Sequence, residues 1–445
     1  MATNSFITLH KVFNNDSQRT LNYLAEYYSN RLSLIKDISS LFGNSFTQDS
    51  MKGKQVLLKP NWVNHDRYPN NPICLRTHND FLLAALESVL QLNPAKVIIG
   101  DAPIQGCNWS KVCAPVLLNE IAALSQQYNV EVTIVDFRRV IYDSSNNQLL
   151  TNQNSISDYI IFDVGKKSYL EPICSNDKEL FRVAQYDYKR LAKVHQKGIH
   201  KYCITKYLFE SDIIISLPKI KTHQKTGITG ALKNLVGLNG DKDYLPHHRI
   251  GGTKYGGDSY AGGNFFRQIS EKVADASNKV IGKPLYKYLF KLALGIWKYS
   301  DPKNKHQWGA AWYGNDTSWR MVLDLNQLII YGKSNGSLSN HPQRELYSLC
   351  DGIIAGQGNG PLFPEPLPLG FISFTNNSAI NDYVFATLMK LNPDKIPLLK
   401  NAFSLYKNDL QNIKVNGENI LFKDLDNYSI EAVLPPGWID YLKNS

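Results

Sequence analysis

The chain has 445 residues, of which 43% are hydrophobic and 20% are charged. This composition allows a large buried core, and the charged fraction argues against intrinsic disorder. The formal net charge is +10, from 49 basic and 39 acidic residues, which suits an anionic partner. Because no recognised nucleic-acid-binding module appears, we expect no specific nucleic-acid partner.

Cysteine usage and the N-terminal residues bear on the compartment. The six cysteines are irregularly spaced and include no Cys-x-x-Cys pair, so neither a zinc ribbon nor an iron–sulfur cluster is expected. The first residues lack the pattern of a signal peptide, and no apolar run approaches the roughly 18 residues that span a bilayer. We therefore expect reduced, buried thiols and a cytoplasmic location.

The first elements in chain order alternate in type. Residues 1–50 have a helical pattern and are interpreted as a helical leader packed on the body. The elements that follow are a strand at 54–60, a helix at 80–92, a strand at 96–101, a helix at 114–128 and a strand at 131–136. This rhythm predicts parallel βαβ units, in which ligands bind at the carboxyl ends of the strands.

The rest of the chain completes an α/β core domain over residues 51–400. We expect insertions near 137–175 and 251–310 and a C-terminal extension at 401–445. Further expected elements are strands at 212–217, 323–331, 352–355 and 370–374, a helix at 381–391 and a small hairpin at 413–422 around Asn416-Gly417. The expected fold is a mostly parallel sheet with flanking helices.

A lysine-striped helix is predicted at 283–299. Lys283, Lys287, Lys291 and Lys298 share one face, and apolar residues cover the remainder. Such a helix can lie on an acidic membrane surface, which would be a peripheral contact. The alternative is an ordinary packed helix with one wet face, which amphipathic patterns usually indicate.

The segment from Leu217 to Asn234 concentrates charge and glycine at the end of a buried strand. Its expected anion-binding residues are Lys219, Lys221, Gly227, Thr229 and Gly230. Glycine lets backbone N–H groups approach a ligand, and the N-terminus of the following helix adds positive potential. The alternative interpretation is a glycine-capped turn with solvated lysines.

Lys233 and His223 are the expected catalytic residues of this segment. A lysine in the first turn of a helix is electrostatically unfavourable, so a bound anion or a lowered pKa would help to explain Lys233. His223 lies in the preceding loop, where a neutral imidazole can act as acid, base or metal ligand.

The stretch after this helix holds five further candidates. Asp241 and Asp243, together with His223, could bind a divalent metal. His247 and His248 could instead serve as acid and base near neutral pH, with Arg249 as an additional anion-binding residue. A hydrogen-bonded turn explains the same spacing equally well.

Three secondary candidates lie near the ends of the first strands. Asp101 follows its strand directly, while Asn61 and His78 belong to the region after the preceding strand. The carboxyl ends of neighbouring parallel strands would bring such residues to one edge of the sheet.

Several stretches resemble the family of the domain of unknown function 362. They are Leu58-Lys-Pro-Asn61, Gly100-Asp101, Asp212 to His223, Thr229 to Gly237, Asp351-Gly352 and Gly358-Asn-Gly-Pro361. The resemblance spans most of residues 55–400. It implies the fold and the position of the site more than a reaction.

A remoter resemblance is to the lactate racemase catalytic domain. His223, Gly227, Thr229, Gly230 and Lys233 fall in step with its lysine-bearing stretch. The resemblance implies that Lys233 carries a lysine-linked nucleotide-type cofactor or holds an anion, and that His223 acts as metal ligand or acid–base. The sequence departs from that domain where Asp101-Ala-Pro103 replaces a histidine.

Two functions remain from the sequence. The first is an enzyme, isomerase-like or metal-assisted, that acts on a small carboxylate- or phosphate-bearing metabolite. Its cofactor would be a divalent metal or a lysine-linked group. The second is a non-catalytic protein that binds a phosphate or nucleotide ligand, associated with a membrane surface.

Overall fold

A 12-stranded sheet forms the centre of the computed structural model, which describes residues 5–43, 45–66, 72–143, 148–151, 154–175, 179–183 and 188–443. The strands on its main path lie in the order β19-β18-β1-β17-β15-β11-β2-β3-β4. Their bounds are β1 (Ile7–Lys11), β2 (Gln55–Pro60), β3 (Lys96–Asp101), β4 (Glu131–Asp136), β11 (Ile213–Leu217), β15 (Glu345–Asn359), β17 (Phe371–Thr375), β18 (Ile413–Val415) and β19 (Glu418–Ile420). From β15 to β4 every neighbouring pair is parallel, which confirms the α/β class.

Three short strands extend this sheet beside the candidate site. They are β12 (Lys219–His223), β13 (Gly227–Thr229) and β16 (Phe363–Leu367). β12 pairs with both β13 and β15, and β16 pairs with β15. The segment singled out from the sequence is therefore a hairpin attached to the sheet.

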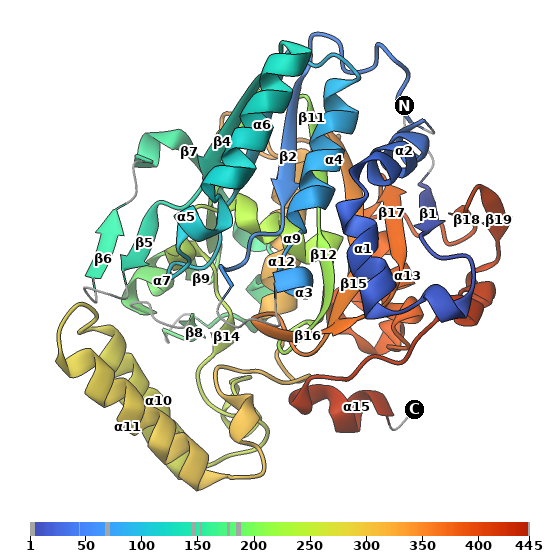
Figure 1. The fold of residues 1–445 in the computed structure, drawn as a ribbon. Helices are drawn as coiled ribbons and strands as arrows, with labels where there is room; N and C mark the ends of the chain where they lie inside the picture. Colours follow the sequence, from blue (N-terminus) through green and yellow to red (C-terminus); the bar gives the residue numbers. More distant parts are fainter. Residues whose placement is uncertain are drawn as a thin grey trace.

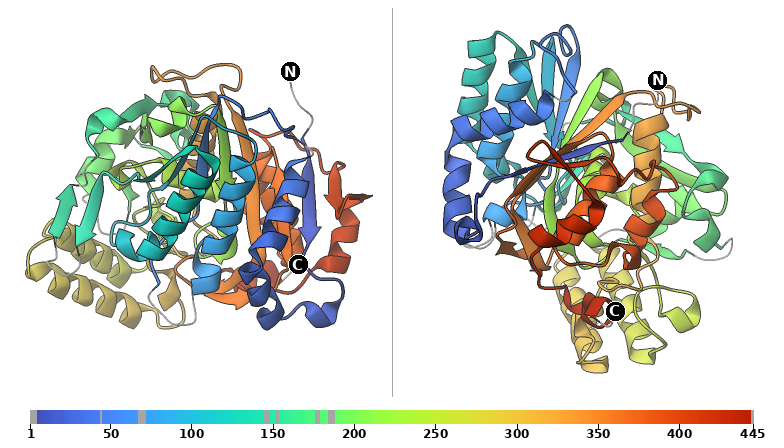
Figure 2. Two further views of the ribbon diagram at one scale, coloured as in Figure 1. Left: turned by 45° about the horizontal axis from the view of Figure 1, so that its top comes forward. Right: turned by 90° about the vertical axis from the view of Figure 1, so that its right-hand side faces the viewer.

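Helices cover both faces of the sheet (Figures 1 and 2). Val56 and Leu58 of β2 pack into the cluster that contains α1 (Leu21–Ser29), α2 (Arg31–Phe42), α4 (Asn79–Leu90) and α6 (Pro115–Tyr128). Leu57 packs into the cluster that contains α9 (Ala231–Asn234), α12 (Ser318–Tyr331), α13 (Ser378–Leu388) and α14 (Pro397–Ala402). Alternate residues of a strand point to opposite faces, so a fully apolar strand buries both.

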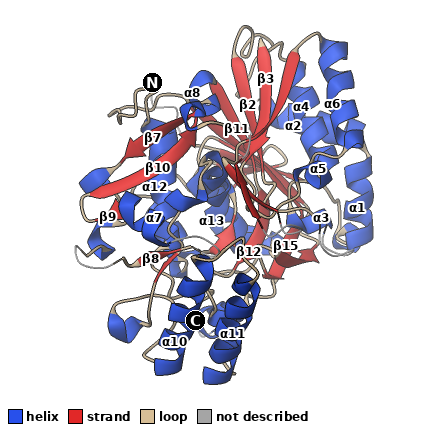
Figure 3. Ribbon diagram, turned by 90° about the vertical axis from the view of Figure 1, so that its left-hand side faces the viewer, coloured by secondary structure: helices blue, strands red, loops and turns tan. Residues whose placement is uncertain are grey.

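Smaller elements fill the expected insertions. The first holds β5 (Val140–Asp143), β6 (Gln148–Thr151) and β7 (Tyr159–Asp163), followed by β8 (Phe181–Arg182), α7 (Tyr188–Val194), β9 (His195–Gln196), β10 (Ile199–Thr205) and α8 (Tyr207–Glu210). The second holds α10 (Phe265–Asn278) and α11 (Leu285–Ser300), which form a helical hairpin that projects from the body (Figure 3). The remaining short elements are α3 (Pro72–Leu75), α5 (Trp109–Val112), β14 (His248–Arg249) and α15 (Ile439–Lys443).

Most predicted elements are confirmed. For β3 and β4, both the first and the last residue agree with the prediction. The helix predicted at 283–299 is α11, and the hairpin around Asn416-Gly417 is β18–β19. Both turn residues have positive φ, 49° and 88°, which the twist of a tight hairpin requires.

Two predictions were wrong. The leader at 1–50 is not only helical, because β1 pairs with β17 and β18 and so belongs to the main sheet. This pairing also joins the C-terminal extension at 401–445 to the sheet. Residues 323–331, predicted as a strand, form most of α12, since their aliphatic run is buried around nearly the whole helix.

The direction of strand addition reverses beside β2. From β2 the sheet grows through β3 to β4 on one side, whereas β11 lies on the other. Such a reversal leaves a crevice outside the carboxyl ends of the strands, where ligands bind in α/β sheets. In Figure 1 this edge is the lower one, near β12 and α3.

A buried ionic network connects α1 to the start of β12. Lys219 Nζ donates to Asp351 Oδ2 at 3.0 Å and to the hydroxyl of Tyr28 at 2.8 Å. Tyr28 also donates to Asp351, whose carboxylate accepts from the backbone N–H of His78. Lys219 and Asp351 are fully buried, so each needs the other.

Replacing Lys219 by methionine should therefore destabilise the protein. The variant leaves a buried carboxylate without its cation, and we expect the free energy of unfolding to fall by about 3–5 kcal/mol. In urea denaturation, Lys219→Met/Asp351→Asn should recover part of this loss. Lys54→Met is the matched control, because the Lys54–Glu345 pair lies at the surface and should be worth less than about 1 kcal/mol. Equal losses for the two lysines would refute this role for Lys219.

Candidate functional site

A cavity of about 940 Å³ lies at the carboxyl ends of β2 and β3. Its polar lining includes Asn61, His65, Asp66, Asp101, Gln105, Lys111, Lys221, His223, Gln224, Lys225, Thr229, Lys233, Asn234, Lys242, His247 and Asn359. The sequence stretches before and after α9 thus meet in one cleft.

Four lysines in this cleft come from three consecutive segments. Lys221 Nζ donates to Asn61 Oδ1 at 2.9 Å and to the Leu75 carbonyl. Lys225 and Lys242 donate to the carbonyls of Gly309 and Ala102, the latter at 3.0 Å. These partners are neutral, so they orient the ammonium groups without cancelling their charge.

Lys233 is the least constrained of the four. Its ammonium has no hydrogen-bond partner among the described residues, although the side chain is largely buried. Burial and, to a smaller extent, the positive charge of Lys225 lower the pKa of Lys233 to about 8. Burial likewise lowers the pKa of Lys225 and Lys242 to about 8, and that of Lys221 to about 7.

The two carboxylates of the cleft are already paired. Asp101 Oδ1 accepts from Lys59 Nζ at 2.6 Å, and Oδ2 accepts from the backbone N–H of Trp62 at 2.7 Å. Asp66 accepts from Arg76. The four lysines therefore retain an excess of positive charge, which favours an anionic ligand.

Gly237 explains how Asp101 reaches Lys59. A Cβ at position 237 would lie 1.9 Å from Asp101 Oδ1 and 2.7 Å from Lys59 Nζ. Only glycine leaves room for this ion pair beneath the cleft.

Two histidines of the cleft are held in opposite tautomers. His223 Nδ1 accepts from the backbone N–H groups of Lys225 and Thr226 at 3.0 and 3.2 Å, so its proton lies on Nε2. His247 Nδ1 contacts the Leu245 carbonyl at 2.8 Å and must be the donor, which leaves Nε2 as an acceptor. Burial holds the pKa of both histidines well below its usual range, so both are neutral at pH 7.

Asparagines and one threonine complete the polar wall. Asn61 Nδ2 donates to Asn234 Oδ1 at 3.1 Å, and Asn234 Nδ2 donates to the Lys59 carbonyl and to Ser216 Oγ, both at 2.9 Å. Thr229 Oγ1 is buried and has no partner among the described residues. A buried hydroxyl without a partner is unfavourable, which points to a ligand that bonds it.

The predicted anion site at the helix N-terminus is wrong. Asp382 of α13 occupies this position, where its oxygens accept from the backbone N–H groups of Ala231 and Leu232 at 2.5 and 3.0 Å. Gly230 is required there because a Cβ would lie 2.1 Å from Asp382 Oδ1. Gly227 lies in the turn of the β12–β13 hairpin with φ of 78°, and Ile396 packs against it.

Other predicted site residues do not line the cleft. Lys219 belongs to the buried network with Asp351. Arg249 lies 3.7 Å from both Asp258 and Asp316, and His248 pairs with β8 through the backbone. His78 caps α4, where its Nδ1 accepts from the backbone N–H of Asp80 at 3.3 Å.

The three predicted metal ligands are not brought together. No three histidine, cysteine, aspartate or glutamate side chains converge as a metal-binding group in the described ranges. Asp241 accepts from Arg139 at 2.8 Å and from the backbone N–H of Asp243 at 3.0 Å. Asp243 itself pairs with Arg190 at 3.1 Å. These carboxylates stabilise a turn and do not meet His223.

Three residues of the site escaped the sequence-based prediction. Lys59 is a lysine inside an otherwise apolar strand, which signals a buried carboxylate partner. Asp382 carries the same kind of signal in the apolar helix α13. The sequence carries no such signal for Lys242, because the position of its side chain in the cleft depends on the turn that Asp241 stabilises.

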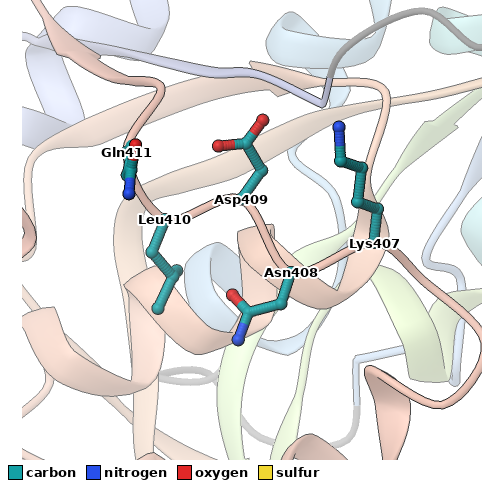
Figure 4. A pocket seen from close by; sticks show the side chains of 5 residues that line it. All are labelled: Lys407, Asn408, Asp409, Leu410 and Gln411. Atoms are coloured by element: carbon teal, nitrogen blue, oxygen red, sulfur yellow. The ribbon is translucent and has the colours of Figure 1, made fainter.

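A second cavity, of about 440 Å³, offers little chemistry by comparison (Figure 4). It is lined by the consecutive residues 407–411 of one loop. Without convergence from different elements, it has no fixed set of ligand-binding groups.

Asp382→Ala should test whether this carboxylate caps α9. The variant leaves two buried backbone N–H groups without an acceptor, so we expect the free energy of unfolding to fall by about 2–4 kcal/mol. Asp382→Asn keeps one acceptor oxygen, so its free energy of unfolding should fall by less. Asp16→Ala, at an exposed position, is the control for chemical denaturation. If Asp382→Ala left the free energy of unfolding almost unchanged, the capping role of Asp382 would be refuted.

The lowered lysine pKa values predict a pH dependence of anion binding. The ordinary lysine pKa is 10.5, so above about pH 7 the unfolded chain holds more protons than the folded one. The free energy of unfolding of the ligand-free protein should therefore rise with pH through this window. Affinity for sulfate, which stays a dianion, should fall over the same range as the lysines lose their protons.

Thermal unfolding between pH 6 and 9.5, with and without sulfate, measures both effects. Lys233→Met should make the sulfate-dependent shift smaller and less sensitive to pH. A sulfate effect that is constant across the range would contradict a site built from these lysines.

The chain was compared with known proteins in sequence and in structure. No curated protein matches the chain in sequence. A crystal structure of a Thermotoga maritima protein aligns over 76% of this chain and 53% of its own, with 9% identity and a TM-score of 0.33. The chain thus spans about half the length of that structure, and so loose a superposition says nothing of function.

The model of the domain of unknown function (DUF362) matches residues 162–387, just over half of the chain. The matched part runs from β7 to α13 and holds the four cleft lysines, both histidines and Asp382. The chain therefore belongs to the family of the domain of unknown function DUF362.

Proposed function

We propose that this protein is an enzyme that moves a proton on a small carboxylate- or phosphate-bearing metabolite. The observation that carries the proposal is the arrangement of the cleft. Four lysines, none of them paired with a carboxylate, lie in one cleft with two neutral histidines of opposite tautomer, and both carboxylates of the cleft are already paired.

The lysines would bind and orient the anionic group. Lys225 and Lys242 are fixed by backbone carbonyls, and Lys221 is fixed by Asn61. A bound anion relieves the repulsion among these ammonium groups, so ligand binding stabilises the fold. Because the charges lie in a largely buried site, the attraction is stronger than at the surface.

His247 would act as the general base. Its Nε2 lone pair takes a proton from the carbon next to the carboxylate, and the electron pair moves onto the carboxylate oxygens. His223 donates a hydrogen bond from its Nε2 to the developing oxyanion and keeps its proton, while the lysine charges stabilise the oxyanion. The Lys233 ammonium, whose pKa is about 8, then gives a proton to the same carbon as the electron pair moves back from the carboxylate oxygens. Solvent carries the proton from His247 to the Lys233 amine, which completes an isomerase-like reaction.

Deuterium exchange in D₂O tests this reaction. The protein is incubated with a panel of 2-hydroxy acids and phosphorylated hydroxy acids, and NMR follows loss of the carbon-bound proton. His247→Ala should slow exchange roughly 10²- to 10⁴-fold. Lys233→Ala should lose turnover as well, while His341→Ala, at an exposed position, should leave it unchanged.

Full turnover by Lys233→Ala would overturn the proposal. The intact mass of the purified chain, measured first, shows whether the Lys233 amine carries a covalent cofactor. Lysine amines near neutral pKa are reactive enough to hold one.

The alternative is a non-catalytic protein that binds a larger anionic ligand, such as a nucleotide. The cavity volume of about 940 Å³ exceeds what a three-carbon acid fills, and Val63, Ile104 and Phe363 add apolar surface. Calorimetric binding without proton exchange for any ligand in the panel would favour this function.

We also propose a reducing, cytoplasmic location. All six cysteines lie in the described part of the chain, and no disulfide joins them. No helix of the described residues is long and apolar enough to cross a bilayer.

A further inference from the structure

We propose that the outer face of the α10–α11 hairpin docks on a lipid bilayer that contains anionic phospholipids. The hairpin projects from the rest of the molecule at the bottom of Figures 1 and 3. Its two helices pack against each other and leave one long side of α11 open to solvent.

The open side of α11 carries an apolar and aromatic stripe. Its members are Leu285, Tyr288, Leu292 and Tyr299, which are 53%, 73%, 53% and 84% exposed. Spacings of three, four and seven residues place them on one face of a helix. The opposite face is the packed one, where Ala293 and Trp297 are buried. The exposed stripe is therefore not needed to hold the hairpin together.

Positive charge borders this stripe. Lys287, Lys291 and Lys298 are exposed, and α11 contains no acidic residue. The acids of α10 are engaged with the body instead. Glu271 accepts from the backbone N–H of Gly251, and Asp275 pairs with Arg182 at 2.8 Å. The outer face of the hairpin is thus cationic without compensation.

The start of α10 continues the aromatic surface. Phe265 and Phe266 are 68% and 54% exposed. They lie beside the end of α11, because Asn264 Nδ2 donates to the Ser300 carbonyl at 3.3 Å. Exposed aromatic rings and lysines with long apolar stems are the groups that enter the interface between water and lipid.

The positive charge of α11 favours a bilayer, rather than a second copy of this chain, as the partner of this face. A two-fold dimer through this face would bring the lysine rows of two α11 helices together, and like charges repel. Anionic head groups attract the same lysines, while the stripe enters the interface. The length and polarity of α11 suit a helix that lies on the surface.

The hairpin is mounted rigidly next to the lysine cleft. Arg267 contacts the rings of both Tyr260 and Trp297, with its guanidinium carbon 5.1 and 4.4 Å from the ring centroids. Trp297 also packs on Trp308 at 5.2 Å, and the following residue, Gly309, accepts from Lys225 of the cleft. Docking of the hairpin would hold the cleft near the head groups.

Vesicle sedimentation of the full chain tests the proposal. We expect binding to vesicles of phosphatidylcholine and phosphatidylglycerol, weakened by salt, and little binding to phosphatidylcholine alone. Replacing Lys287, Lys291 and Lys298 by glutamine should lower the affinity roughly 100-fold. Replacing Tyr288, Leu292 and Tyr299 by serine should abolish sedimentation.

Matched variants on other surfaces serve as controls. For charge, Lys36, Lys333 and Lys423 are replaced by glutamine, and for apolar area, Leu32, Val116 and Leu421 by serine. These variants should sediment like the unaltered chain. Equal losses for hairpin and control variants would overturn the proposal, as would no binding to anionic vesicles. Light scattering that shows a dimer lost only in the hairpin serine variant, without vesicle binding, would assign the face to a second copy.

Discussion

The ion pair between Lys59 and Asp101 holds the floor of the cleft. It links the ends of β2 and β3 at 2.6 Å, and the second oxygen of Asp101 fixes the turn after β2 through Trp62. Gly237 presses against the same pair. If Asp101 were not engaged in this way, its charge would be available to the cleft lysines. The ion pair therefore preserves the positive character of the site while it closes the fold beneath it.

The two buried lysines of β12 differ in the kind of partner that their ammonium groups find. Lys219 meets a carboxylate, whereas Lys221 meets only an amide oxygen and a backbone carbonyl. A register shift in the pairing of β12 with β15 lies between them, which aims the two side chains at different partners. The first lysine stabilises the fold. Burial lowers the pKa of the second lysine to about 7, and a bound anion would favour its charged form.

The capping of α9 by Asp382 decides which groups the cleft offers to an anion. A site made of backbone N–H groups would bind anions with little dependence on pH. Here those donors bond to a carboxylate of the chain itself, and side-chain ammonium groups line the cleft. Burial lowers the pKa of His223 and His247, and the nearby lysine charges lower it further because a cation opposes a second positive charge.

The sequence alone determined the parallel βαβ core, its strands and helices, and the segment from Leu217 to Asn234 as the centre of the site. Those features depend on local periodicity and on the order of elements, which one sequence contains. Tertiary structure decided which charges remain available. Lys219 and Lys221 look alike in sequence, as do Asp101, Asp241 and Asp382, but each finds its partner on an element distant in the chain. A charged side chain is available to a ligand only if no such partner neutralises it, and only the packed fold brings those partners together.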